Sequence, residues 1–259
     1  MPIALIGPAF GGLLGGISPR LPFWIAAGLS LVNAIYGLFI LPESLPREKR
    51  APFQWKRANP VGSFFLLRKY PGVLAIASVA FLNFLSHEVL PSMWVLYSNY
   101  RYHWGTRTVG LTLAAVGVFS AAVQGGLIRP AVAKLGERRA LLFGLGCGAI
   151  GFAAYGLAPT GLIFLVGIPF GALWGFSGPS VQALMTKLVD PSEQGRLQGA
   201  LAGLRGISGM MGPGIFTGIF AFFIGAHAPR HLPGAPFLLA AALLFSAMLL
   251  ANLVARQPD

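Results

Sequence analysis

Apolar runs long enough to cross a lipid bilayer recur along the whole chain and restrict the kind of fold it can form. A helix needs about 20 apolar residues to span the hydrocarbon core. With 55% hydrophobic and only 10% charged residues, the chain does not have the composition of a soluble domain. The sequence predicts an all-α polytopic membrane protein with eight transmembrane helices, at residues 2–18, 22–41, 72–97, 108–128, 140–158, 161–183, 199–224 and 235–255.

Basic residues between the apolar runs predict which side of the membrane faces the cytoplasm. Fourteen of the 19 Lys and Arg residues fall on one side, in the loop 42–71, in the connection near 129–139, and at Lys187, Arg196 and Arg256. Four fall on the other side, and Arg205 lies within a span. Cytoplasmic loops carry an excess of basic residues, so we expect the loop 42–71 to be cytoplasmic.

Two further features are explained by this orientation. An aromatic cluster follows the third run and is expected to mark the outer interface; it consists of Tyr97, Tyr100, Tyr102 and Trp104. The net charge of +12 is accounted for by basic residues that set topology, so nucleic acid is not an expected partner. Membrane lipid is the partner that these features predict.

The third run contains the only acid within a predicted span. Glu88 follows His87, and Pro91 comes three residues later. An acid at membrane depth costs a few kcal/mol on insertion scales, so it marks a proton, ion or substrate path by default. The alternative is an interfacial acid near the outer leaflet. Pro91 lacks an N–H and crowds the carbonyl of His87, which predicts a kink at this point.

Glu88 and His87 are therefore the candidates for proton coupling. Adjacent helical positions point about 100° apart, so the two side chains are not expected to share one face. A hydrogen bond to a neighbouring helix is the alternative role for His87.

Other polar residues within the spans are candidates for lining a substrate cavity, although each one alternatively bonds a neighbouring helix. They are Asn83, Gln124, Ser177, Gln182 and Arg205. Arg205 has a further alternative, since its long side chain can extend toward the cytoplasmic interface. Its estimated depth differs from that of Glu88 by about 13 Å, so no direct pair between the two is expected.

The sequence gives no support to an enzyme. Cys147 is the single cysteine, which excludes a disulfide framework and a cysteine metal cluster. The spans contain no paired carboxylates and no nucleophile with a base in reach. We expect no metal and no cofactor.

Four short motifs, in order, resemble the tetracycline-resistance-like drug/proton antiporters of the major facilitator superfamily. Gly7, Pro8, Gly11 and Gly12 resemble the family's GPxxGG antiporter motif in its fifth span, and residues 41–44 (LPES) resemble the end of its sixth. Residues 194–199 are similar to the entry of its eleventh span. The loop between its eighth and ninth spans is similar to residues 135–141, which include Gly136, Glu137, Arg138 and Arg139.

The resemblance implies a correspondence to spans 5–12 of a twelve-helix fold. Residues 1–41 would be a remnant of the N-terminal half, 42–71 a basic cytoplasmic loop, 72–255 the C-terminal six-helix half, and 256–259 a cytoplasmic tail. A loose echo of residues 7–27 in residues 212–241 agrees with duplicated halves. Four N-terminal spans are then expected to be missing, and they would be a partner of this chain.

The resemblance also implies a function. It favours proton-coupled export of a small lipophilic compound or drug across a bacterial inner membrane. The alternative is a truncated, non-transporting membrane fragment, or an assembly or anchoring subunit. Tetracycline exporters carry a histidine in the eighth span and an acid in the ninth, where this chain has Ser120 and Gly148. That departure points to a relative with a relocated titratable group.

Overall fold

The structure is a computed structural model that describes residues 18, 20–40, 60–225 and 231–254, and every regular element within them is a helix. The chain divides into two units, residues 1–53 and 54–259. The first unit has one described helix, α2 (Leu21–Phe39), whose 19 mostly apolar residues are enough to cross a bilayer. The predicted all-α membrane fold is confirmed.

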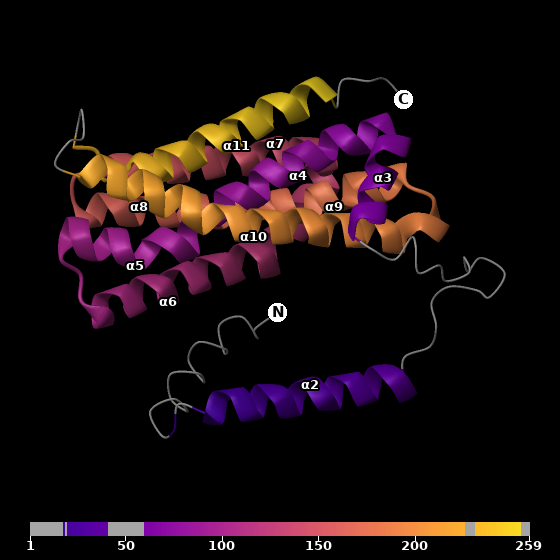
Figure 1. The fold of residues 1–259 in the computed structure, drawn as a ribbon, viewed down its shortest axis with the longest axis horizontal. Helices are drawn as coiled ribbons and strands as arrows, with labels where there is room; N and C mark the ends of the chain where they lie inside the picture. Colours follow the sequence, from indigo (N-terminus) through magenta and orange to yellow (C-terminus); the bar gives the residue numbers. More distant parts are fainter. Residues whose placement is uncertain (1–17, 19, 41–59, 226–230, 255–259) are drawn as a thin grey trace. The chain divides into compact units, whose positions relative to one another are not determined.

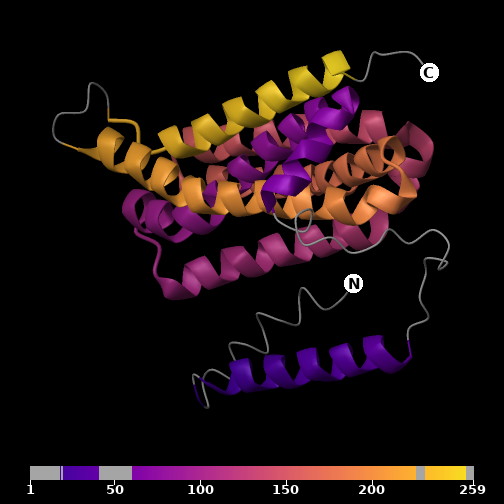
Figure 2. The ribbon, with the colours of Figure 1, turned by 45° about the vertical axis from the view of Figure 1, so that its right-hand side comes forward.

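The second unit is a bundle whose helices lie side by side (Figures 1 and 2). Helix α11 packs along α7 and α4, and α10 packs on α3, α4 and α5. A π-helical turn, Val123–Leu127, joins α6 to α7. The helices of this unit are α3 (Pro60–Lys69), α4 (Pro71–His87), α5 (Val89–Tyr102), α6 (Thr106–Ala122), α7 (Ile128–Leu157), α8 (Gly161–Leu173), α9 (Ser177–Leu188), α10 (Gln194–Ile224) and α11 (Ala235–Val254).

The predicted count of eight transmembrane helices is not confirmed. Six stretches of the described residues are long and apolar enough to span a membrane. One of them, Thr106–Leu157, has 52 residues and covers two predicted spans, 108–128 and 140–158. A straight helix of that length would measure about 78 Å, far more than the ~30 Å of a hydrocarbon core. The predicted span 2–18 lies outside the described residues.

Gly136 divides this long stretch. Its backbone has φ 76° and ψ 161°, a combination that is essentially restricted to glycine. The residues on both sides of it remain helical, so the expected loop near 129–139 is a sharp turn between two helices.

The helix of the third predicted run is interrupted, as Pro91 predicted. Helix α4 ends at His87 and α5 begins at Val89. Between them, the Glu88 N–H donates to the Leu85 carbonyl at 3.1 Å, which is the spacing of a tight turn. The residue at this interruption is Glu88, the acid within the third predicted span.

Glycines let α7 pack closely in the centre of the bundle. A Cβ at Gly144 would lie 2.8 Å from the Ser177 backbone nitrogen, and one at Gly151 would lie 3.1 Å from that of Gly171. Small residues at such contacts allow helix backbones to approach without a hydrophobic driving force. Helix α7 is thereby in contact with α8, α9 and α11.

Aromatic rings fill one half of the bundle around Phe164, which is fully buried. Their centroids lie 4.5–6.0 Å from that of Phe164; the rings belong to Trp94, Tyr97, Tyr102, Trp104, Tyr155 and Phe237. Tyr97 is 1% exposed and donates a hydrogen bond to the Tyr155 carbonyl at 3.2 Å. The Tyr97 ring is therefore part of the core of the bundle, and its place at the outer interface stays a prediction.

Candidate functional site

A cavity of about 760 Å³ lies within the second unit, with lining residues on every helix from α4 to α10. Aromatic rings supply much of its wall, namely Phe84, Trp94, Phe152, Tyr155 and Trp174. The polar and charged side chains that reach it are Asn83, His87, Glu88, Ser120, Gln124, Ser177 and Arg205. A ligand pocket is normally an apolar concavity of this size with a few polar groups, so this cavity, which we call the central cavity, is the candidate site.

His87 and Glu88 both line the central cavity. They are adjacent in sequence, at the junction of α4 and α5, and both still reach the one cavity. The His87 ring lies 5.6 Å from the ring of Trp174. Glu88 is half-buried and lies against α10, where its Cγ is 2.7 Å from the position of a Cβ on Gly212.

Asn83 connects α4 to the segment between α8 and α9. Its Oδ1 accepts hydrogen bonds from Trp174 Nε1 at 2.7 Å and from Ser177 Oγ at 3.1 Å. All three residues line the cavity. The two roles left open for Asn83, cavity lining and helix bonding, are therefore combined in one side chain.

Arg205 projects into the central cavity from α10. Its guanidinium carbon lies 4.8 Å from the centre of the Phe84 ring, a cation–π contact. Among the described residues no carboxylate oxygen lies within 4.0 Å of it, Glu88 included. The cavity therefore holds an acid and a base that are not joined as an ion pair.

The two glutamines among the cavity candidates, Gln124 and Gln182, differ in whether they reach the cavity. Gln124 lines the cavity from the π-helical turn, a kind of irregularity that is frequent at functional sites. Gln182 is half-buried on α9 and is not part of the cavity lining.

The positions expected to carry the tetracycline exporters' histidine and acid are also placed. Ser120 lines the cavity. Gly148 is buried, and a Cβ there would lie 2.7 Å from the Trp174 ring and 2.6 Å from Leu244. An acidic side chain at Gly148 has no room beside Trp174, so a titratable group in this bundle has to enter the cavity elsewhere.

Comparison with known proteins identifies the family. The model of the Major Facilitator Superfamily matches residues 3–213. The chain belongs to the Major Facilitator Superfamily. It is a multi-pass membrane protein of a transporter family, as the resemblance implied.

Several individual proteins are similar in sequence to this chain. The class C tetracycline resistance protein of Escherichia coli is 35% identical over 215 residues, which are 83% of this chain and 54% of the relative. The class G protein of Vibrio anguillarum is 35% identical over 225 residues, 86% of this chain and 56% of the relative. Hippocampus abundant transcript 1 protein of Homo sapiens is 27% identical over 94% of this chain and 55% of the relative. The chain thus spans about half the length of these relatives.

A solved structure supports the fold. The human organic anion transporter MFSD10 (TETRAN) superposes with a TM-score of 0.74 at 20% identity, over 96% of this chain and 62% of that one.

The loop motif of this superfamily member ties three helices together at one end of the bundle. Glu137 pairs with Lys187 of α9 at 2.6 Å, and Arg138 donates to the Asn252 carbonyl of α11 at 3.3 Å. Arg139 is exposed. The antiporter motif residues Gly7, Pro8, Gly11 and Gly12 lie outside the described residues.

A second polar network connects α3 to the turn before α10, and sequence reasoning missed it. Lys69 pairs with Glu193 at 2.8 Å. The Tyr70 hydroxyl lies 2.8 Å from both Glu193 and Asp190. The hydrogen bond to Glu193 raises the pKa of Lys69, and the bonds to Glu193 and Asp190 raise the pKa of Tyr70. Lys69 and Tyr70 lie at least 120 residues before Asp190 and Glu193, so no local sequence pattern indicates this contact.

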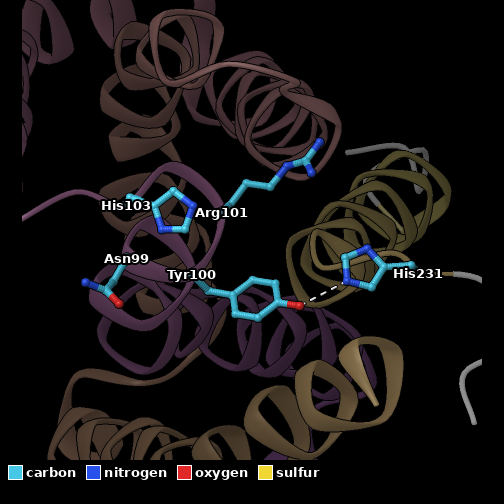
Figure 3. Close-up of a pocket in the computed structure, with 5 residues that line it drawn as sticks. All are labelled: Asn99, Tyr100, Arg101, His103 and His231. Carbon is cyan, nitrogen blue, oxygen red and sulfur yellow. Dashed lines mark hydrogen bonds between the residues drawn. The ribbon is translucent and has the colours of Figure 1, made fainter. Parts of the chain in front are cut away.

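Figure 3 shows a second, shallower pocket of about 540 Å³ where α5 ends. Tyr100 points toward His231, and its hydroxyl lies 3.0 Å from the His231 Nε2. The other lining residues are Asn99, Arg101 and His103. His103 ends α5 with a left-handed backbone (φ 56°). All five residues are exposed, so this pocket offers less enclosure to a small molecule than the central cavity.

Within the described residues, no group of three or more His, Cys, Asp and Glu side chains is placed to hold a metal ion.

Proposed function

We propose that this chain forms part of a secondary active transporter that exports a small lipophilic compound in exchange for protons. The observation that carries the proposal is the central cavity, in which Glu88 is the acid and aromatic rings form much of the wall. A carboxyl group in such a place can load and release a proton as access alternates between the two sides of the membrane. Aromatic walls favour a substrate with a large apolar surface.

The relatives' names support export of a drug-like compound, since several are tetracycline resistance proteins. The cavity of this chain differs at Ser120, and Gly148 leaves no room for an acid. We therefore propose that proton coupling is carried by Glu88, with His87 beside it. On this proposal tetracycline itself is one test compound among several.

The proposal also covers the other spans of the transporter and the membrane in which it lies. Because the chain spans about half the length of its relatives, we propose that further spans, encoded with it or supplied separately, form the opposite wall of the substrate path. We place the whole in a bacterial inner membrane, with the loop 42–71 in the cytoplasm.

The experiment compares Glu88→Gln with wild type in everted membrane vesicles, using the longest open reading frame that contains this chain. Wild type should accumulate substrate when a pH gradient is imposed, and Glu88→Gln should not. Exchange of labelled for unlabelled substrate without a gradient should survive in the variant, because it needs no net proton movement. Glu48→Gln makes the same chemical change in the loop 42–71, outside the predicted spans, and serves as the control. Gradient-driven accumulation by Glu88→Gln would contradict the proposal.

A further inference from the structure

The cation in the central cavity, Arg205, forms no ion pair with a described residue. Arg205 reaches the cavity, makes no hydrogen bond to a described residue, and has only the Phe84 ring against its guanidinium plane. An Arg within a membrane span usually faces the bundle interior or a water-filled cavity, where it marks a substrate or ion path. A ring contact on one face leaves the edge of the guanidinium, with its five N–H donors, free to bind.

Arg205 is exposed in the described part of the chain and lines the central cavity. It lies 11 residues after the start of α10 at Gln194, or about 16 Å along the helix. The structure directs it toward the cavity, beneath Phe84 of α4. The guanidinium is thereby presented to the same space as Glu88 and the aromatic wall.

We propose that Arg205 binds the anionic group of the substrate, and that the substrate is an aromatic carboxylate. This inference rests on the proposed function and names its substrate class. The guanidinium fork matches a carboxylate in two parallel hydrogen bonds. The rings of Trp94, Phe152 and Trp174 receive the aromatic body. Asn83 uses its Oδ1 for Trp174 and Ser177, which leaves its amide N–H groups as further donors at the cavity wall.

Arg205 and Glu88 have separate tasks in this arrangement. Arg205 neutralises the bound carboxylate, while Glu88 stays available to carry a proton because no ion pair joins the two. A neutral analogue of the same substrate loses the guanidinium bonds and keeps only the aromatic contacts.

The test measures binding to the purified chain in lipid nanodiscs at pH 7, without a pH gradient. Two probes share one ring and differ in charge: 4-nitrobenzoate and 4-nitrobenzamide. Both quench tryptophan fluorescence, and Trp94 and Trp174 lie in the cavity wall. Wild type should bind the benzoate about tenfold or more tightly than the benzamide, the range for a hydrogen bond to a charged group.

Three variants make the test specific. Arg205→Gln should bind both probes equally and weakly. Arg205→Lys should keep part of the preference, because it retains the charge but lacks the fork. Arg107→Gln removes the same charge outside the cavity lining and should behave as wild type. Thermal midpoints measured for each variant show that the chain remains folded, and Arg205→Lys carries the test if Arg205→Gln does not fold.

Equal affinity of wild type for the two probes, or a preference that persists in Arg205→Gln, would overturn the inference. Failure of the proposed function would look different: a benzoate preference that depends on Arg205, in a protein whose transport is insensitive to a pH gradient. Coupled transport without a benzoate preference would leave the proposed function standing and remove the substrate class.

Discussion

Replacing Gly212 with alanine should disturb the residue to which we assign proton coupling. A Cβ at Gly212 would overlap the Cβ of Glu88 and lie 2.7 Å from its Cγ. Glu88 sits at the interruption between α4 and α5, so its backbone and the facing turn of α10 have to separate to admit the methyl group. Gly209, one turn earlier on α10, has nothing within 4 Å of its Cβ position and is a matched control.

Gly212→Ala should destabilise the protein, whereas Gly209→Ala should not. Overpacking costs about 1–3 kcal/mol. At about 2–4 °C per kcal/mol for a chain of this size, Gly212→Ala should lower the thermal midpoint by roughly 2–12 °C. Gly209→Ala should leave it unchanged or raise it, because alanine is favoured over glycine in a helix interior by up to about 1 kcal/mol.

The assay is thermal unfolding of the purified variants in one detergent, followed by tryptophan fluorescence. A double variant, Glu88→Gly with Gly212→Ala, should recover most of the lost midpoint, since it removes one of the two overlapping Cβ atoms. An unchanged midpoint in Gly212→Ala, or equal losses in Gly212→Ala and Gly209→Ala, would refute the packing of Glu88 against α10.

Four further predictions follow from particular residues. Asn83→Ala removes the acceptor of two hydrogen bonds from buried donors and should cost about 2–4 kcal/mol in thermal or denaturant unfolding; a loss below 1 kcal/mol would contradict its bridging role. Gly136→Ala forces a side chain into a backbone conformation reserved for glycine and should cost about 1–3 kcal/mol by the same measurement, so a neutral result would argue against the sharp turn. Lys69→Met and Tyr70→Phe should lower the thermal midpoint at pH 8. Because their pKa values are raised above the ordinary 10.5 and 10.0, their contribution is complete below those values and is lost as pH rises past the raised ones, so the difference from wild type should shrink at strongly alkaline pH; a difference that grows with pH would have the wrong sign. A cysteine at Gln54 should not react with an impermeant maleimide in intact cells, and labelling there would reverse the predicted orientation.

Hydropathy and proline chemistry predicted the broad fold. Apolar length identified the membrane helices, because every backbone group in lipid has to be satisfied within its own segment. Pro91 predicted the interruption before α5, since the effect of a missing N–H is local. The separation of predicted spans near 129–139 was right in place but wrong in form, because the turn needs only Gly136 to reverse the chain.

Contacts between distant residues were beyond the sequence. The sequence does not show that His87 and Glu88 both reach one cavity, because the extent of a cavity depends on the other helices that wall it. Tyrosine is common at membrane interfaces, so the residue type of Tyr97 does not indicate that it is buried. Only its packing against Phe164 shows that it belongs to the core. Cavity lining depends on which face of each helix turns inward, which explains why Ser177 lines the cavity and Gln182 on the same helix does not.

Proton flux in proteoliposomes tests the central claim most directly. The longest reading frame that contains this chain is reconstituted with a pH-sensitive dye inside, a substrate gradient is imposed, and the internal pH is recorded. We expect a pH change driven by the substrate gradient in wild type and in Glu48→Gln, and no change in Glu88→Gln. Proton flux of wild-type size in Glu88→Gln would contradict the assignment of Glu88 as the proton-coupling residue.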